Sequence, residues 1–569
     1  MSQDPTLIIR NGTIVDGTGA PPRAADIAIA GDRIAAIGAI PATRGVEEID
    51  ARGLLVTPGF IDLHTHYDAQ VTWAEHITPS SALGVTTVLI GNCGVGFAPC
   101  APENRARLVE LMEGVEDIPE VVLTEGLPWD WESFPDYLDR LAARRFDLDV
   151  ATQVPHAALR VHVMGSRAAA REVATAADRA SMARLAAEGI EAGALGFSTS
   201  RTLNHKTLKG ESIPTLDAAE AELAAIADAV GATGKGWLQV ISDFDEAIEG
   251  EFAMLRGLVA RSGRPMTMTI LERDSKPREW RHLLDSIAEA NANGLTMTGQ
   301  VLTRPTGVLL GFELSQHPFA DCPSFRPIAS RPFAERLAAL RDPEFRARLL
   351  AEIPARSGPT HRLRGWDKIF PLGDPPDYEP PAERSLGAEA RRSGVDPAAL
   401  AYDRLLENGG KTILYRPLSN YAHGDLETVR EMMADPHTLI GLGDGGAHVG
   451  VLCDASAMTY GLTHWTRDRR GGRFPVEWMI RRLTRDNAHA IGLHDRGVLA
   501  PGMRADLNLI DHDRLRLGAP EIVYDLPAGG RRLMQRAEGF AATIVAGEVV
   551  RRDGIPTGAL PGRLVRGAR

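Results

Sequence analysis

Two histidines separated by one residue are the residues in this chain best suited to chemistry. His64 and His66 end the run 59–66, and an apolar segment at 54–60 leads directly into that run. Side chains at positions i and i+2 of a strand point to the same side, so both imidazoles would reach one point. Two imidazoles at the end of a buried strand form half of a metal site, and such ligands favour zinc.

A cysteine and an aspartate could complete this site. Cys93 lies in a Gly-Asn-Cys-Gly run after the apolar segment 86–90, and Asp444 lies in a glycine-rich run after 439–442. A lone cysteine is either a small buried apolar residue or a ligand, and an aspartate among glycines is either a turn residue or a ligand. In a closed barrel the first and last strands are neighbours, so Asp444 would reach a metal held by His64 and His66. Its carboxylate would serve as a ligand and as the general base for metal-activated water.

The middle of the chain alternates strand-like and helix-like stretches, the pattern of repeated βα units. Helical patterns cover 179–191 and 216–229. Eight strands are expected at 54–62, 86–90, 150–154, 194–198, 238–242, 266–271, 296–301 and 439–442. We therefore predict an α/β fold, a (β/α)8 TIM-like barrel whose site lies at the carboxyl ends of its strands.

Both ends of the chain are rich in strand patterns. Short β-type runs occupy 7–10, 12–15, 25–29 and 33–37, with hairpin-type pairs at Asn11-Gly12 and Gly31-Asp32, and similar runs return at 505–510 and 542–550. We predict a small β-sandwich built from residues 1–57 and 491–569. The barrel would occupy 58–490, with insertions near 99–146 and 315–396 whose length is typical of lids.

Composition limits the partners and the location. The chain has 569 residues and a net charge of −12, which argues against nucleic acid or an acidic membrane surface as its main partner. Neither a signal peptide nor a membrane span is visible, and four cysteines in so long a chain do not form a disulfide framework. We expect a cytoplasmic protein that acts on a small molecule, with homo-oligomerisation left open.

Several motifs in order along the chain resemble the N-acyl-D-amino-acid deacylases (D-aminoacylases) of the amidohydrolase superfamily. The matching runs lie at 11–17, 64–66, 84–87, 91–94, 114–119, 131–134, 193–199 and 557–563. The resemblance implies a (β/α)8 barrel with a small β-sandwich, and hydrolysis of an acyl–nitrogen bond by zinc-activated water. It also implies that His64, His66, Cys93 and Asp444 are the metal-site residues.

The chain departs from the deacylase pattern on the fifth and sixth strands. Those deacylases carry a metal-binding histidine on each, whereas the corresponding positions here fall near Ile241 and Ile270. The lysine that binds the substrate carboxylate in the family falls near Glu272, which has the opposite charge. Since isoleucine cannot bind a metal, we expect one zinc ion rather than two. The family's specificity for free N-acyl-D-amino acids is not assumed for this chain, whose substrate could lack a carboxylate or present it to a different cation.

Other polar residues follow the expected strands and are candidates for substrate binding: His156, Arg201, His205, Arg304 and His448. An arginine there could bind a carboxylate or phosphate, or lie in a solvated loop or at a helix start. His448 could also replace a missing ligand, and Asp243 and Glu272 could supply oxygen ligands.

The sequence thus predicts an amidohydrolase, a metal-dependent hydrolase of amide C–N bonds with Asp444 as the general base. One alternative keeps the barrel and a mononuclear site but opens cyclic amides or deaminates its substrate. A second alternative is a non-catalytic relative that binds a ligand.

Overall fold

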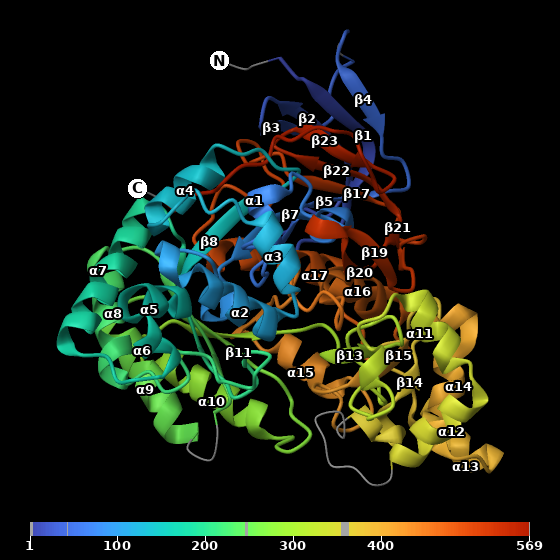
Figure 1. Cartoon of the computed structure of the whole chain (residues 1–569). Helices are drawn as coiled ribbons and strands as arrows, with labels where there is room; N and C mark the ends of the chain where they lie inside the picture. Colours follow the sequence, from blue (N-terminus) through green and yellow to red (C-terminus); the bar gives the residue numbers. More distant parts are fainter. Residues whose placement is uncertain (1–3, 43, 245–247, 354–362, 568–569) are drawn as a thin grey trace.

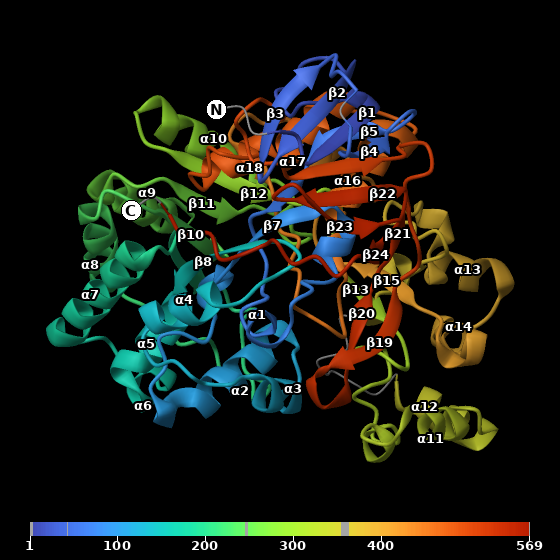
Figure 2. The same cartoon turned by 90° about the horizontal axis from the view of Figure 1, so that it is seen from above.

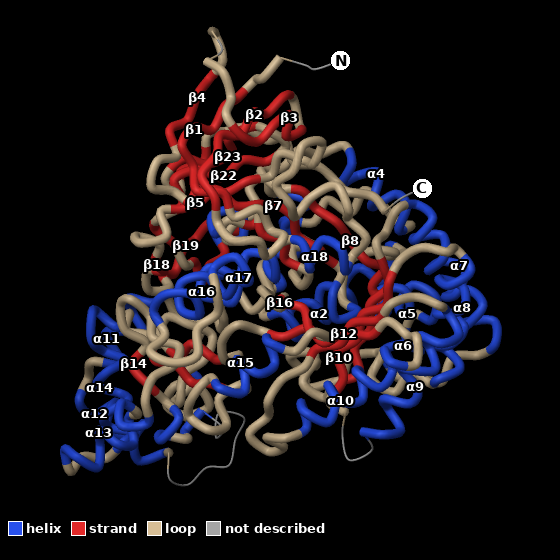
Figure 3. The backbone as a smooth tube through the Cα atoms, turned by 180° about the vertical axis from the view of Figure 1, so that it is seen from behind, coloured by secondary structure: helices blue, strands red, loops and turns tan. Residues whose placement is uncertain are grey.

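Eight parallel strands form the central sheet of the protein (Figures 1 and 3). The computed structural model describes residues 4–42, 44–244, 248–353 and 363–567. Neighbouring strands of the sheet follow one another in sequence: β6 (Phe60–Asp62), β7 (Val85–Ile90), β8 (Asp149–Pro155), β9 (Gly196–Arg201), β10 (Trp237–Ser242), β11 (Met266–Thr269), β12 (Met297–Val301) and β16 (Thr438–Ile440).

The first and last strands meet just beyond their ends. Thr65 pairs with Gly445 in an isolated parallel bridge, and the backbone N–H of His66 donates to the carbonyl of Gly445 at 2.8 Å. The N–H of Asp444 donates to the carbonyl of His64 at 2.9 Å. The sheet is therefore curled and closed, and the predicted (β/α)8 class is confirmed.

Helices cover the outside of this sheet (Figure 3). Helix α7 (Ala176–Ala192), between β8 and β9, begins at a capping box, in which Thr175 and Asp178 satisfy each other's backbone N–H groups, one reason why the helix starts there. The helices between or after the barrel strands include α5 (His156–Met164), α7 (Ala176–Ala192), α8 (Glu220–Ala232), α9 (Ile248–Ser262), α10 (Glu279–Ala292), α15 (Glu427–Ala434), α17 (Val476–Leu483) and α18 (Arg485–Ala490). Among the described residues, no helix combines the length and apolarity that a membrane crossing requires.

A second, mostly antiparallel sheet is built from both ends of the chain, as the sequence predicts, and Figure 2 shows it beside the barrel. Strand β5 joins the two halves, because it pairs with β1 on one side and with β17 on the other. The strands of this sheet are β1 (Leu7–Ile14), β2 (Arg23–Ala30), β3 (Arg33–Gly38), β4 (Glu47–Asp50), β5 (Leu55–Pro58), β17 (Leu507–Ile510), β22 (Phe540–Val545), β23 (Glu548–Arg552) and β24 (Ile555–Pro556).

Two details of the predicted strands are wrong. The pair Asn11-Gly12 is a bulge inside the single strand β1 rather than a hairpin, since the pairing shifts between Ile9 and Gly12 and Asn11 is left-handed (φ 58°). The segment 54–62 is two strands, β5 in the terminal sheet and β6 in the barrel. The break falls at Gly59, where a Cβ atom would lie 2.1 Å from the hydroxyl of Thr86.

The two insertions form structure of their own. The first, after β7, contains α2 (Arg105–Glu116), α3 (Glu120–Gly126) and α4 (Phe134–Ala142). The second carries a separate apolar core around Phe312, Phe319 and Tyr402, and it stands apart from the barrel helices in Figure 1. Its elements include β13 (Gly307–Leu310), α11 (Phe333–Leu340), α12 (Pro343–Glu352), β14 (Phe370–Pro371), α13 (Leu386–Ser393), α14 (Pro397–Gly410) and β15 (Leu414–Pro417). Residues 354–362 of the predicted insertion lie outside the description.

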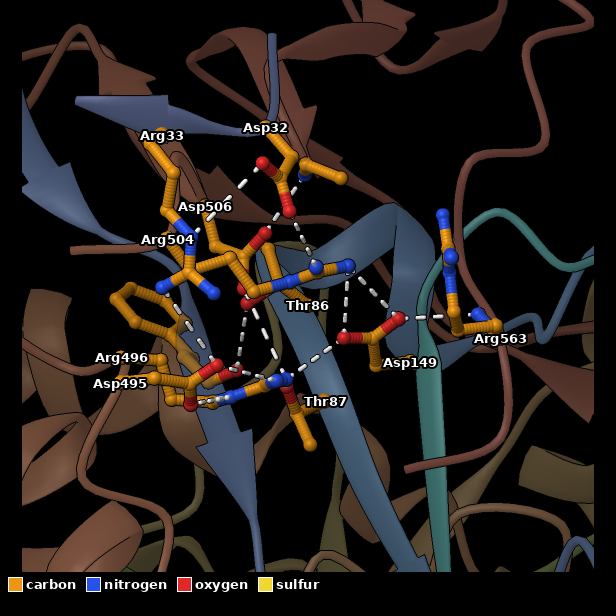
Figure 4. A network of polar contacts seen from close by, with 12 residues as sticks. Asp32, Arg33, Thr86, Thr87, Asp149, Asp495, Arg496, Arg504, Asp506 and Arg563 are labelled. Atoms are coloured by element: carbon orange, nitrogen blue, oxygen red, sulfur yellow. Dashed lines mark hydrogen bonds and ion pairs between the residues drawn. The ribbon is translucent and has the colours of Figure 1, made fainter. Parts of the chain in front are cut away.

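A buried ion network fastens the barrel to the terminal sheet (Figure 4). Asp149, at the start of β8, contacts Arg496 at 2.7 Å and Arg504 at 2.9 Å. Arg504 also contacts Asp506, whose carboxylate accepts from the N–H of Ala546 in the chain turn after β22. Because these charges are buried, each depends on its partners, and losing one would leave others uncompensated.

We therefore expect Asp149→Asn to lower the free energy of unfolding by about 3–5 kcal/mol, the usual cost of breaking a buried ion pair. Urea unfolding followed by circular dichroism measures this loss. The matched control is Asp228→Asn, which removes an exposed ion pair with Arg261 and should leave the unfolding midpoint close to wild type. Equal effects of the two substitutions would show that the network does not stabilise the junction.

Candidate metal centre

Three predicted ligands lie together at the carboxyl ends of the first two barrel strands. One ligand atom from each of His64, His66 and Cys93 falls within 4.8 Å of the others, and all three residues are buried. The Nε2 atom of His64 lies 3.1 Å from the Sγ atom of Cys93. The structure thus brings the two imidazoles together with a thiol that follows them by 27 residues or more in the sequence.

Asp444 faces this cluster from the loop that follows the last barrel strand, β16. Its Oδ1 atom lies 3.6 Å from Nε2 of His64 and 3.8 Å from Nε2 of His66. Both imidazoles therefore direct Nε2 toward the same carboxylate oxygen. The backbone of Asp444 is left-handed (φ 43°), a conformation that costs energy in a residue other than glycine and is often found at functional sites.

The buried carboxylate of Asp62 holds the two strand ends in place. Its Oδ1 atom accepts from the N–H of His64 at 3.1 Å and from the N–H of Gly443 at 3.4 Å. A Cβ atom at position 443 would lie 1.9 Å from this carboxylate, so the residue before Asp444 needs to be glycine. Asp62 thereby fixes the spacing between the histidine pair and the late aspartate.

Cys93 is positioned by a tight turn after β7. It lies in a short 3-10 turn, Asn92–Gly94, with a left-handed backbone (φ 55°). Its N–H donates to the side-chain oxygen of Gln239 on β10 at 3.1 Å. At Gly91 a Cβ atom would lie 2.4 Å from the carbonyl of Gln153, so glycine permits a close approach of the two backbones.

Each histidine of the pair has an outer partner that sequence reasoning missed. The Nδ1 atom of His64 lies 2.8 Å from the side-chain oxygen of Gln300 on β12. The Nδ1 atom of His66 lies 3.3 Å from Oε1 of Glu116, the last residue of α2. The sequence could have indicated Gln300, because it is a polar residue in a strand expected to be buried. A buried amide is costly unless it has a hydrogen-bond partner.

Burial and neighbouring charges shift the ionisation of the whole centre. Burial lowers the pKa of His64 to about 4 and lowers that of His66 well below its usual value, so both imidazoles are neutral at pH 7. Burial raises the pKa of the Cys93 thiol and of the Asp444 and Glu116 carboxyl groups well above their usual values. Neutral imidazoles can offer their lone pairs to a metal ion, and a nearby cation would favour the ionised forms of the buried thiol and carboxyl groups. A cation would therefore stabilise this centre.

The donor set fits a zinc ion. Two imidazole nitrogens, a thiol and a carboxylate are the ligand types that zinc binds. The Nε2 atom of His64 lies 3.1 Å from the Cys93 thiol, and the two Nε2 atoms lie 3.6 and 3.8 Å from Asp444, distances that suit donors around one ion. Outer partners on both imidazoles are what metal-binding histidines usually have.

Two further predicted residues lie within electrostatic reach of the centre. The charges of His448 and His205 both contribute to lowering the pKa of His66. His448 directs Nε2 to Glu116 at 3.5 Å, and the Nδ1 atom of His205 lies 2.8 Å from the hydroxyl of Ser200. Both imidazoles are therefore placed near the ligand cluster, and their substrate-binding role stays a prediction.

The other three predicted substrate-binding residues are engaged within the protein. His156 uses both ring nitrogens, on Thr199 at 2.8 Å and on Glu222 at 2.9 Å. Arg201 forms a two-point contact with Glu251. Arg304, 1% exposed, contacts Asp454 at 2.8 Å and stacks over the ring of Tyr378.

The residues on the fifth and sixth strands also have other surroundings. Asp243 accepts from Thr202 and from the N–H of Leu203, and Glu272 accepts from Thr428 and from the N–H of Ala422. Ile270 is fully buried and packs close to Gly299 on β12, and Ile241 packs against the main core. The carboxylates of Asp243 and Glu272 are thus engaged by these other groups, and the contacts described for them do not include His64 or His66.

The closed barrel and its cluster of imidazoles, thiol and carboxylate at the strand ends define the class of metal-dependent barrel hydrolases. A model of the amidohydrolase family matches residues 47–551, and the chain belongs to that family. It is a hydrolase that acts on carbon–nitrogen bonds.

The relatives found by sequence include both deacylases and proteins without an assigned activity. A D-aminoacylase of Alcaligenes xylosoxydans xylosoxydans is 39% identical over 198 residues, which is 35% of this chain and 38% of that relative. An uncharacterised protein of Mycobacterium tuberculosis is 29% identical over 597 aligned positions, covering 96% of this chain and 92% of the relative. The full-length similarity therefore extends to a protein without an assigned activity.

Solved structures share the fold over the whole chain. The crystal structure of a D-aminoacylase has a TM-score of 0.65 at 23% identity and covers 99% of this chain and 100% of its own. The N-acyl-D-glutamate deacylase of Bordetella bronchiseptica, solved with zinc and a phosphonate inhibitor, gives a TM-score of 0.65 at 24% identity and the same coverage.

The geometry predicts that metal content depends on His64. We expect His64→Asn to lose most of the zinc that the wild-type protein retains after dialysis, since it removes one ligand of the cluster. Elemental analysis of purified protein measures this content. The control His282→Asn changes a half-exposed histidine outside the cluster and should retain wild-type zinc; a full zinc complement in His64→Asn would contradict the ligand assignment.

Proposed function

We propose that this protein is a zinc-dependent hydrolase of amide C–N bonds that resembles the D-aminoacylases, with Asp444 as its general base. One observation carries the proposal: Nε2 atoms of His64 and His66 both face the Oδ1 atom of Asp444, at 3.6 and 3.8 Å, with the thiol of Cys93 beside them. We propose a single ion, because Ile241 and Ile270 lie near the positions where the resemblance would require two further metal-binding histidines.

A bound zinc ion would supply Lewis-acid activation of the amide carbonyl and of water, whose pKa it lowers to about 7. His64, His66, Cys93 and Asp444 would hold the ion. The Asp444 carboxylate would accept the proton of the attacking water and pass it to the leaving nitrogen. Asp62 keeps this carboxylate in register with the histidine pair through the strand ends.

The names of relatives suggest the substrate class. A D-aminoacylase and an N-acyl-D-glutamate deacylase are among the similar proteins, which supports an N-acyl compound as substrate. Arg201 and Arg304 already form ion pairs with carboxylates of the protein, which argues against their binding a free carboxylate of the substrate. We propose an acyclic amide as the substrate and a cytoplasmic location.

Metal removal tests the proposal directly. We expect a chelator to abolish hydrolysis and added zinc to restore it, because the ligands alone cannot activate water. The assay compares N-acyl-D-amino acids, N-acyl amines that lack a carboxylate, and cyclic amides, with the wild-type protein in each case. Turnover of cyclic amides alone would favour the ring-opening alternative. A protein that binds no metal and hydrolyses none of these compounds would contradict the proposal.

A substitution separates the base from the ligands. Asp444→Asn should lower kcat by about 100-fold or more, the usual contribution of a general base, while the protein stays folded. Stopped assays on the best substrate, with circular dichroism and zinc analysis of the same sample, measure both effects. The exposed Asp425 provides the control, Asp425→Asn, which should retain wild-type kcat. Unchanged turnover in Asp444→Asn would refute the assigned role.

A further inference from the structure

Glu116 is a buried carboxylate between two imidazoles of the site. It ends α2, in the first insertion, and its side chain is 1% exposed. One carboxylate oxygen lies 3.3 Å from Nδ1 of His66, and the other lies 3.5 Å from Nε2 of His448. The backbone N–H of His448 also donates to the carbonyl of Glu116. The insertion is thus attached to the loop that carries Asp444.

The contact with His66 involves the ring nitrogen that faces away from the cluster. A neutral imidazole donates through one nitrogen and offers a lone pair on the other. The Nδ1 atom of His66 lies within ion-pair distance of Glu116 without forming an aligned hydrogen bond. The carboxylate thereby favours a proton on Nδ1, which leaves the Nε2 lone pair directed at the ligand cluster. An outer carboxylate of this kind fixes the tautomer and the ring orientation of a metal-binding histidine.

The chemistry of the residue supports a role beyond packing. A buried carboxylate is costly to keep, and a residue needed only to fill space could be apolar. The charges of Asp444 and Asp68 add to the unfavourable surroundings of Glu116. A cation held by His64, His66 and Cys93 would offset this charge, so the carboxylate and the proposed metal support each other.

We propose that Glu116 is a positioning residue for the metal site: it orients His66 toward the ion and holds His448 beside the centre. This inference rests on the proposed function, since it requires a metal at the cluster. His64 has a parallel arrangement, with the amide of Gln300 in the outer position. The two imidazoles thus differ in their outer partner, which is a carboxylate for His66 and a neutral amide for His64.

The test measures zinc affinity and is independent of turnover. Competition with a chromophoric chelator is carried out on the wild type, on Glu116→Gln, and on Glu113→Gln as the control from the same helix. Glu113 accepts from the N–H of Glu120, which glutamine can also do. We expect Glu116→Gln to bind zinc about 10- to 100-fold more weakly, the usual effect of losing an outer carboxylate, and Glu113→Gln to match the wild type.

Zinc rescue separates positioning from simple damage. Saturating zinc should restore most of the turnover of Glu116→Gln, because the ligands themselves are intact. Wild-type zinc affinity in Glu116→Gln, or a loss of turnover that saturating zinc does not restore, would overturn the inference. If Glu116→Gln fails to fold, Glu116→Asp replaces it; an intermediate affinity supports the inference, and wild-type affinity overturns it.

The two proposals fail in different ways. A wild-type protein that takes up zinc and hydrolyses amides, beside a Glu116→Gln variant of equal zinc affinity, would overturn this inference alone. A wild-type protein that takes up no divalent metal would overturn the proposed function and this inference with it.

Discussion

Closure of the barrel is the constraint on which the site depends. The histidine pair and Asp444 are 380 residues apart in sequence, yet Asp444 donates its N–H to the carbonyl of His64, and His66 donates to Gly445. These hydrogen bonds extend the pairing of the first and last strands beyond their ends. Side chains on this short extension therefore project from neighbouring backbones, and the ligand cluster follows from the closure.

Four residues around the ligands each fix the position of one part of the site. Asp62 sets the separation of the two strand ends, Gln239 fixes the turn at Cys93, and Gln300 and Glu116 contact the outer nitrogens of the two imidazoles. Three of these partners come from barrel strands and one from the first insertion. Rigid strands thus orient most of the site, while the insertion adds a second carboxyl group beside that of Asp62.

The sequence predicts the barrel well because each strand and helix leaves a local pattern. All eight expected strand segments overlap barrel strands, and the site residues follow from the rule that parallel strands end at one face. The split at Gly59 and the bulge at Asn11 escaped this reasoning, since both depend on which distant strand each residue pairs with. Glu116 escaped it for the same reason, because its partners lie 50 and 332 residues away.

The stability of the protein and the chemistry of the site have separate physical sources. At the site, burial opposes the ionisation of Asp444, Glu116 and Cys93 and raises their pKa values, so their charged forms need a compensating cation. At the opposite end of the barrel, Asp149 and its arginines pair buried charges completely enough to join the two sheets. Since a folded domain is only marginally stable, a strained site persists only where the rest of the structure over-determines it. The closed barrel and the buried ion network provide the stability that the site lacks. The ligand cluster can therefore keep an arrangement that suits a cation, even though that arrangement does not stabilise the fold.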